Sequence, residues 1–242
     1  GNDQATDMHN TAIGYGAGGQ ITTGTGNTFI GSEAGDGVQA NFSNTAVGAF
    51  ALGVACGDQN TMIGNSAGII TSGHHNTCLG YYSGGQLSSG SRNIIIGHEA
   101  GSNLFSNGLF QVTTSNDRIV LGTTEATNAY IQIDWTIVSD ERDKTLINDI
   151  PVGLNLLNEL RPVTYKFKKS REDDTPVGRT KYGFIAQEIL EAEGDTPVIV
   201  DDEEDEKLKM TNAHLVAVLV KSVQELSSKV TSLEAEVTKL KG

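Results

Sequence analysis

A five-residue pattern recurs six times near the start of the chain: Asn10-Thr-Ala-Ile-Gly14, Asn27-Thr-Phe-Ile-Gly31, Asn44-Thr-Ala-Val-Gly48, Asn60-Thr-Met-Ile-Gly64, Asn76-Thr-Cys-Leu-Gly80 and Asn93-Ile-Ile-Ile-Gly97. The steps between copies are 17, 17, 16, 16 and 17 residues. A second glycine motif follows most copies, as in Ser32-Glu-Ala-Gly35. One unit of this length buries its apolar residue only by stacking on the next unit. The period therefore predicts a β-roll or β-helical solenoid.

Each copy predicts a very short strand that ends at its glycine. We expect the asparagines and glycines to form the corners, because both residue types tolerate positive φ. Cys56 and Cys78 lack partners at metal-ligand spacing and are interpreted as small packing residues. Glu33 and Glu99 recur at one repeat position, which favours a solvent-facing corner over a catalytic carboxylate pair.

The repeat fades after about residue 102. Arg118–Gly122 and Tyr130–Val138 carry alternating apolar residues, which predict strands that close the shaft. Trp135 is the only tryptophan, and we expect it to be a packing anchor.

Composition separates the chain into two parts. Residues 1–138 hold two of the 17 Lys and Arg residues and nine of the 30 acids, so the net charges are −7 before residue 139 and −6 after it. Nucleic-acid binding requires a basic surface, and neither part has one. No apolar run is long enough to span a membrane, and the start of the sequence lacks a secretory signal. His74, His75 and His98 favour loop surface over a metal site, and no cofactor motif occurs.

The last 32 residues, 211–242, carry a heptad pattern. Valines recur at one core position and leucines at the other: Val216, Val223, Val230 and Val237, with Leu219, Leu226, Leu233 and Leu240. This pattern predicts a coiled-coil helix and therefore self-association, although valine at a with leucine at d does not by itself select three strands. His214 lies just before this heptad run, where a packed or solvent-facing role is expected.

A charged stretch, Ser139-Asp-Glu-Arg-Asp-Lys144, begins the second part of the chain. Taken alone it is a charged turn. A neutral lysine can nevertheless serve as the base that activates a serine hydroxyl, and a turn would bring Lys144 to Ser139. Arg142 would then disfavour the charged lysine or stabilise an oxyanion.

Four ordered features resemble the endosialidase-type intramolecular chaperone domain: Ser139–Lys144, Leu160-Arg-Pro-Val-Thr-Tyr165, Tyr182-Gly-Phe-Ile-Ala-Gln-Glu188 and the heptad helix. The resemblance covers about residues 139–242. It implies a small α+β domain that trimerises at the end of a phage tail spike or fibre, directs folding of the preceding β-structure and is then released by self-cleavage. The repeats in turn resemble the β-roll heads of trimeric adhesins and phage fibre shafts.

By motif position, the resemblance makes Ser139 the nucleophile and Lys144 its general base in a single-turnover serine peptidase acting in cis. Asp140 and Arg142 are implied as supporting residues, as are Gly183, Gln187 and Glu188. The predicted divisions are repeats at 1–102, a β-structured neck at 103–138, the chaperone and autoprotease domain at 139–210, and a trimeric coiled-coil helix at 211–242.

The sequence thus predicts a homotrimeric tail-fibre or spike tip, located in the virion and assembled in the host cytoplasm. A host-surface glycan is the expected partner, and no nucleic acid, membrane insertion, metal or cofactor is expected. One alternative is a non-cleaving structural adhesin with a trimerisation cap. A membrane-bound transcription regulator is disfavoured by the glycine-rich shaft.

Overall fold

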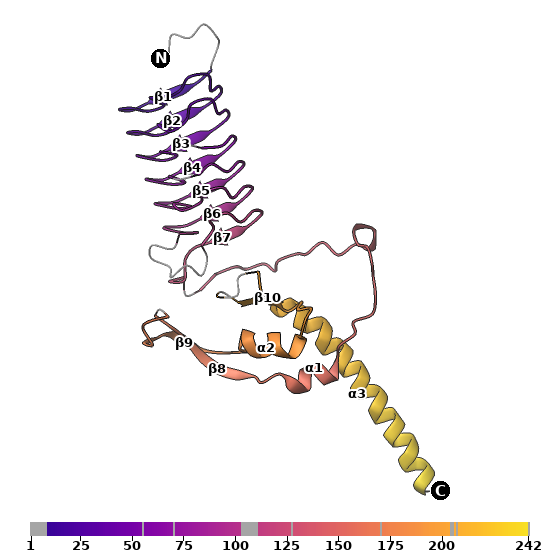
Figure 1. Cartoon of the computed structure of the whole chain (residues 1–242). Coiled ribbons are helices and arrows are strands. Elements are labelled where there is room, and N and C mark those ends of the chain that lie inside the picture. The colour runs from indigo at the N-terminus through magenta and orange to yellow at the C-terminus, as the bar shows by residue number, and fades with distance from the viewer. Residues whose placement is uncertain are drawn as a thin grey trace. The chain divides into compact units, whose positions relative to one another are not determined.

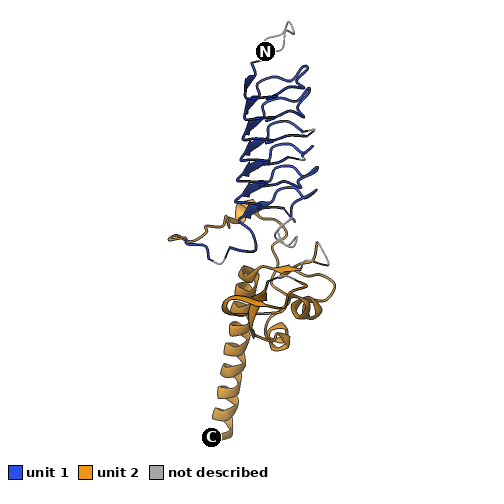
Figure 2. Cartoon of the chain, turned by 90° about the vertical axis from the view of Figure 1, so that its left-hand side faces the viewer, with its two compact units in different colours: residues 1–130 blue, residues 131–242 orange. Residues whose placement is uncertain are grey.

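The computed structural model describes residues 9–54, 56–69, 71–102, 111–126, 128–169, 171–203, 206 and 208–241. It divides into two compact units, Gly1–Tyr130 and Ile131–Gly242, which Figure 2 colours separately. Residues 103–110 of the predicted neck lie outside the described residues.

The first unit is the predicted β-solenoid. Its strands are β1 (Thr11–Ile13), β2 (Thr28–Ile30), β3 (Thr45–Val47), β4 (Thr61–Ile63), β5 (Thr77–Leu79), β6 (Ile94–Ile96) and β7 (Ile119–Leu121). They form one parallel sheet in chain order, each strand stacked on the next (Figure 1). The pairing is in register with the repeat, so that Thr28 lies beside Thr45 and Ile30 beside Val47. The steps of 16 or 17 residues therefore correspond to one coil each.

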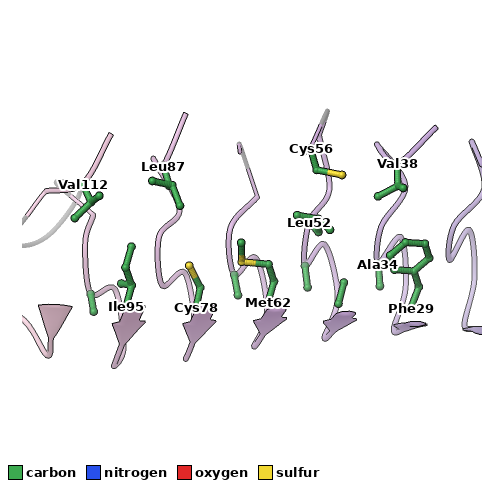
Figure 3. Packing of buried hydrophobic residues seen from close by; sticks show 14 residues of the cluster. Phe29, Ala34, Val38, Leu52, Cys56, Met62, Cys78, Leu87, Ile95 and Val112 are labelled. Carbon is green, nitrogen blue, oxygen red and sulfur yellow. The ribbon is translucent and has the colours of Figure 1, made fainter. Parts of the chain in front are cut away.

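The solenoid core is built in columns along its axis. The middle residue of each inner strand points inward and is fully buried: Phe29, Ala46, Met62, Cys78 and Ile95. Side chains from the opposite wall, such as Leu87 and Val112, meet this column (Figure 3). Burial raises the pKa of the Cys56 and Cys78 thiols to about 12, so both cysteines are packing residues, as the sequence suggested.

The repeat asparagines have a different role from the one expected. They are absent from the positive-φ positions, which fall instead on the preceding residues, for example His75 and Arg92. Their side chains lie inside the solenoid, where each Oδ1 accepts a backbone N–H from the next coil. The Asn76 N–H donates to Asn60 Oδ1 at 2.9 Å, and Asn60 Nδ2 donates to the Gly73 carbonyl at 2.9 Å. This buried ladder satisfies backbone groups that the turns leave unpaired.

The glycine that ends each strand does need positive φ. Gly64 has φ +136°, and a Cβ there would lie 2.3 Å from the carbonyl oxygen of Gly80 in the next coil. Glu99 corrects a second expectation, because it is buried rather than solvent-facing. Its carboxylate lies 3.7 Å from His98 Nε2, and His98 stacks on Tyr81 with ring centroids 5.2 Å apart.

The outward face of the solenoid sheet carries an uncovered apolar column. The third residue of each strand points away from the core, and most of these residues are more than a third exposed. We call this column the solenoid stripe; it consists of Ile13, Ile30, Val47, Ile63, Leu79, Ile96 and Leu121. A threonine column beside it begins each of the first five strands. The stripe contains no charged residue.

The second unit combines short helices, hairpins and one long helix. Its elements are η1 (Glu141–Asp143), α1 (Leu154–Glu159), β8 (Val163–Lys168), β9 (Pro176–Gly183), α2 (Ala186–Glu193), β10 (Val200–Asp201), β11 (Lys209–Met210) and α3 (Asn212–Lys241). Two antiparallel pairs form, β8 with β9 and β10 with β11. A small core joins α1, α2, β10 and the start of α3 through Leu156, Ile189, Val200, Leu215 and Val218. The predicted fold class, a β repeat followed by a small α+β domain and a C-terminal helix, is confirmed.

Helix α3 uses only one side for this core. Leu215, Val218 and Ser222 are buried, whereas the heptad residues are all more than two-fifths exposed, from Leu226 at 45% to Leu240 at 86%. Helix α3 therefore keeps an apolar heptad stripe that the described residues of the second unit leave exposed. None of the described helices combines the length and the apolar character required to cross a bilayer.

The segment from Tyr130 to Val138 differs from the expected strand. It contains no regular secondary structure, with a bend at Gln132 and Ile133, and all its residues are exposed. Trp135, expected to be a packing anchor, is 74% exposed.

Candidate functional site

The turn that begins the predicted chaperone domain brings Ser139 and Lys144 together. The 3-10 helix η1 spans Glu141–Asp143, and its last hydrogen bond runs from the Lys144 N–H to the Glu141 carbonyl at 3.1 Å. Across this single turn, Lys144 Nζ lies 2.7 Å from Ser139 Oγ. The spacing of five residues thus becomes a direct contact between the predicted nucleophile and its predicted base.

Asp140 and Arg142 hold this turn. The Asp140 carboxylate caps η1 by accepting the Arg142 backbone N–H at 2.9 Å. The same carboxylate binds the Arg142 guanidinium, with Nε at 3.0 Å and a terminal nitrogen at 2.6 Å. The hydrogen bonds from Arg142 hold the pKa of Asp140 below its usual range. Because Asp140 binds Arg142, that guanidinium supports the turn. Its suggested effect on Lys144 or on an oxyanion stays a prediction.

The two reactive groups are open to solvent in the single chain. Residues 131–149 are all exposed, and none of them belongs to the core of the second unit. A lysine becomes an effective base when burial or a neighbouring cation favours its neutral form. Ser139 and Lys144, the predicted serine–lysine dyad, therefore lie within hydrogen-bond distance of each other but are exposed to solvent.

The second predicted block is assembled around the β8–β9 hairpin. Gly183 ends β9 opposite Val163, and a Cβ on it would lie 3.0 Å from the Tyr165 ring. Glu188, in the first turn of α2, forms an ion pair with Arg161, whose Nε lies 3.2 Å from Glu188 Oε2. The Leu160–Tyr165 and Tyr182–Glu188 motifs therefore meet in space. Gln187 is exposed beside them.

The two groups of predicted site residues remain separate. Among the described residues, no hydrogen bond or ion pair joins the Ser139–Lys144 turn to Gly183, Gln187 or Glu188. Gly183 and Glu188 therefore have a structural explanation within the second unit, in the hairpin and at the start of α2. Their assignment as supporting residues of the dyad stays a prediction.

Glu193 supports the chain segment that leads into β10, a role that the sequence did not predict. Its carboxylate accepts three consecutive backbone N–H groups, from Val198 at 2.9 Å, Ile199 at 2.8 Å and Val200 at 3.1 Å. His214 Nδ1 lies 2.6 Å from the Val198 carbonyl, so the segment entering β10 is held from α2 and from α3. No local motif could have revealed this arrangement, because the glutamate sits in an ordinary helix end and its partners are backbone groups.

His74 joins neighbouring coils of the solenoid. His74 Nδ1 accepts the Asp58 N–H at 3.0 Å, and the His74 N–H donates to Ser91 Oγ at 3.1 Å. Each side chain thus accepts a backbone group from the preceding coil. Within the part of the chain that the structure describes, no three His, Cys, Asp or Glu side chains gather closely enough to hold a metal ion.

Comparison with protein families agrees with the second unit. Residues 139–198 match the model of the family described as chaperone of endosialidase. The match begins at Ser139 and includes both the Ser139–Lys144 turn and the Tyr182–Glu188 block. No curated protein and no solved structure matches the chain. The C-terminal region therefore carries an intramolecular chaperone domain of the endosialidase type, and its role is that of a chaperone.

Proposed function

We propose that this chain is part of a phage tail fibre or spike whose C-terminal domain assembles three copies, directs folding of the solenoid and then releases itself by cleavage beside Ser139. The observation that carries the cleavage step is the 2.7 Å contact between Lys144 Nζ and Ser139 Oγ in a turn fixed by Asp140 and Arg142. The match of residues 139–198 to the chaperone of endosialidase supports the chaperone step.

The proposed reaction is a displacement at the Val138–Ser139 peptide bond. Neutral Lys144 takes the hydroxyl proton as Ser139 Oγ attacks the Val138 carbonyl carbon. The C–N bond breaks, the proton passes to the Ser139 nitrogen, and an ester joins Val138 to Ser139 Oγ. Water then hydrolyses this ester, which leaves a carboxylate on Val138 and restores the serine hydroxyl. The reaction occurs once per chain and needs no cofactor.

Self-association is supported by two uncovered apolar surfaces, the solenoid stripe and the heptad stripe of α3. Stripes of this length on both units favour contact with another protein surface. The solenoid stripe repeats at the spacing of stacked strands, about 4.8 Å. Another copy of the same solenoid repeats its side chains at the same spacing, so the copies fit without a change of register. Joining the copies at α3 would raise their local concentration and reduce the cost of aligning long-range β-structure.

Assembly would also supply the burial that the dyad lacks. Ser139 and Lys144 are exposed in the single chain, and neighbouring copies are the groups that could cover them. Covering them would favour neutral Lys144 and thereby couple cleavage to assembly. Loss of the template after cleavage would make the folded shaft kinetically stable.

The main alternative is a non-cleaving adhesin in which the C-terminal domain is a permanent trimerisation cap. Exposure of the dyad is the observation that favours this alternative. Location in the virion and a host-surface glycan as partner of the shaft stay proposals that rest on the family resemblance.

The proposed order of events is tested with the Ser139→Ala chain, which can assemble but cannot cleave. Light scattering should give three times the chain mass of 25.6 kDa, with the solenoid resistant to protease. Trimeric Ser139→Ala together with a cleaved unmodified chain supports the proposal. A monomeric, protease-sensitive Ser139→Ala chain would contradict a template that assembles before it cuts, and a trimer that never cuts would favour the permanent cap.

A further inference from the structure

The nine residues before Ser139 expose an unusual amount of apolar side chain. Tyr130 is 93% exposed, Ile133 78%, Trp135 74% and Ile137 74%. Residues 130–138 belong to neither strand nor helix, and within the described chain their backbone groups make no hydrogen bond. The segment therefore has neither the ladder nor the side-chain cover that an ordered apolar segment needs.

The residue order in this segment is that of a strand with one apolar face. Ile131, Ile133, Trp135 and Ile137 occupy alternate positions, and Gln132, Asp134 and Thr136 lie between them. Successive side chains of a strand point to opposite faces, so extension would gather the three isoleucines and the tryptophan on one side. β-branched and aromatic residues are those that favour strands. The missing component is a partner strand.

We infer that residues 130–138 pair with the same segment of other copies of this chain, with Ile131, Ile133, Trp135 and Ile137 turned toward one another. The inference rests on the proposed self-association and adds the element that would hold the shafts together after cleavage. The segment ends at Val138, so cleavage at the Val138–Ser139 bond leaves all nine residues on the shaft. The copies would then remain joined once α3 has been released.

Charge places little obstacle in the way of a second copy as the occupant. Side-by-side copies bring equivalent residues close together, and like charges at such positions destabilise the pairing. The whole chain has a formal charge of −13, yet the apolar face of this segment carries no charged residue. Asp134 is the only charged residue between Tyr130 and Val138. It falls on the opposite face, so each added copy places one like charge beside its equivalent, outside the apolar face.

Uncovered apolar stripes on both sides of the segment in sequence favour the same occupant. The solenoid stripe ends at Leu121, which is 56% exposed, and the heptad stripe of α3 begins at Val216, which is 59% exposed. If parallel copies cover these two stripes, residues 130–138 of each copy would lie beside residues 130–138 of the next copy. One kind of partner therefore accounts for all three uncovered surfaces.

Trp135 provides a direct probe of this pairing because it is the only tryptophan. The Ser139→Ala chain is kept intact, so the readout does not depend on cleavage. Its native fluorescence is compared with that of the denatured chain, with acrylamide as quencher. Pairing predicts a blue-shifted emission and a fall of about threefold or more in the quenching constant, because interface cores are packed as closely as protein interiors.

Two matched variants distinguish the faces. Ile133→Asn, on the apolar face, should restore quenching of Trp135, whereas Gln132→Asn, on the other face, should leave it protected. Light scattering on the same samples separates this inference from the proposed function. An oligomer whose Trp135 is as accessible as in the denatured chain overturns the pairing and leaves assembly intact. A monomer with accessible Trp135 overturns both.

Discussion

Lys144 Nζ and Ser139 Oγ lie 2.7 Å apart across a single 3-10 turn. Neither group is buried, and the only ion pair within the turn joins Asp140 to Arg142 among the residues described. The relationship therefore combines a hydrogen-bond distance with the exposure of both groups to solvent. It leads to the view that cleavage depends on contacts made after the chain has assembled.

Lys144 can be tested apart from the hydrogen bond it makes. Lys144→Arg retains a donor that can reach Ser139, but a guanidinium stays protonated and cannot act as a base. Lys144→Met removes both properties while retaining the length of the side chain. We expect both variants to lose cleavage by at least about a hundredfold, which is within the usual contribution of a general base. Appearance of the fragment on denaturing gels over time measures the rate.

A Lys144→Arg chain that cleaves at the unmodified rate would show that the lysine only positions the serine. Equal trimer content in both variants, measured by light scattering, is the control for assembly.

The heptad stripe of α3 should control both assembly and cleavage. Leu226 is 45% exposed and lies on the stripe, while Ser228 is exposed on the other side of the same helix. Leu226→Asp places a charge in the expected seam and should abolish the oligomer, whereas Ser228→Asp should retain it. Because burial of the dyad is expected to need neighbouring chains, Leu226→Asp should also stop cleavage. Rapid cleavage of a monomeric Leu226→Asp chain would contradict that coupling.

The asparagines of the buried ladder should contribute unequally to the free energy of unfolding. Asn60 accepts the Asn76 N–H and donates to Gly73, so Asn60→Ala leaves two backbone groups without their partners. Asn44 accepts the Asn60 N–H, but its Nδ2 atom has no partner. Each buried group left unsatisfied costs about 1–3 kcal/mol. Urea unfolding followed by circular dichroism should therefore show a larger loss of stability for Asn60→Ala than for Asn44→Ala, and equal losses would argue against the ladder.

The two cysteines report on the solenoid core. Their pKa values of about 12 leave about one thiol in ten thousand as thiolate at pH 8, against about one in four for a free cysteine. Native protein should therefore react slowly with a disulfide reagent at pH 8, and both thiols should react at once in denaturant. The reaction should accelerate as pH rises toward 12, because the thiolate population increases. Fast reaction of two thiols in native protein would contradict a packed core.

The sequence predicted the solenoid well because its period determines both the coil length and the register. Asn27, Asn44 and Asn60 recur at the steps that place one coil on the next, and their columns follow directly. The period gives no side-chain direction, however. The asparagines were expected at corners and instead lie inside, and Glu99 was expected to face solvent and is instead buried.

The contact between Ser139 and Lys144 could be predicted from the sequence, but the contacts around the rest of the second unit could not. Five residues from Ser139 to Lys144 suffice to predict a turn, and the structure places the two groups within hydrogen-bond distance. The supporting role of Glu193 could not be predicted, because its partners are the backbone groups of Val198, Ile199 and Val200. The alternating residues of 130–138 predict a strand that the single chain does not form. That prediction is correct only if the partner strand belongs to another copy of the chain.

Intact mass spectrometry of the purified chain beside Ser139→Ala tests the central claim most directly. The unmodified chain should give two species that divide at the Val138–Ser139 bond, and Ser139→Ala should give only the full mass of 25.6 kDa. Full-length mass in both samples, under conditions where both are trimeric, would contradict self-release. The same two fragments in both samples would assign the cut to another protease.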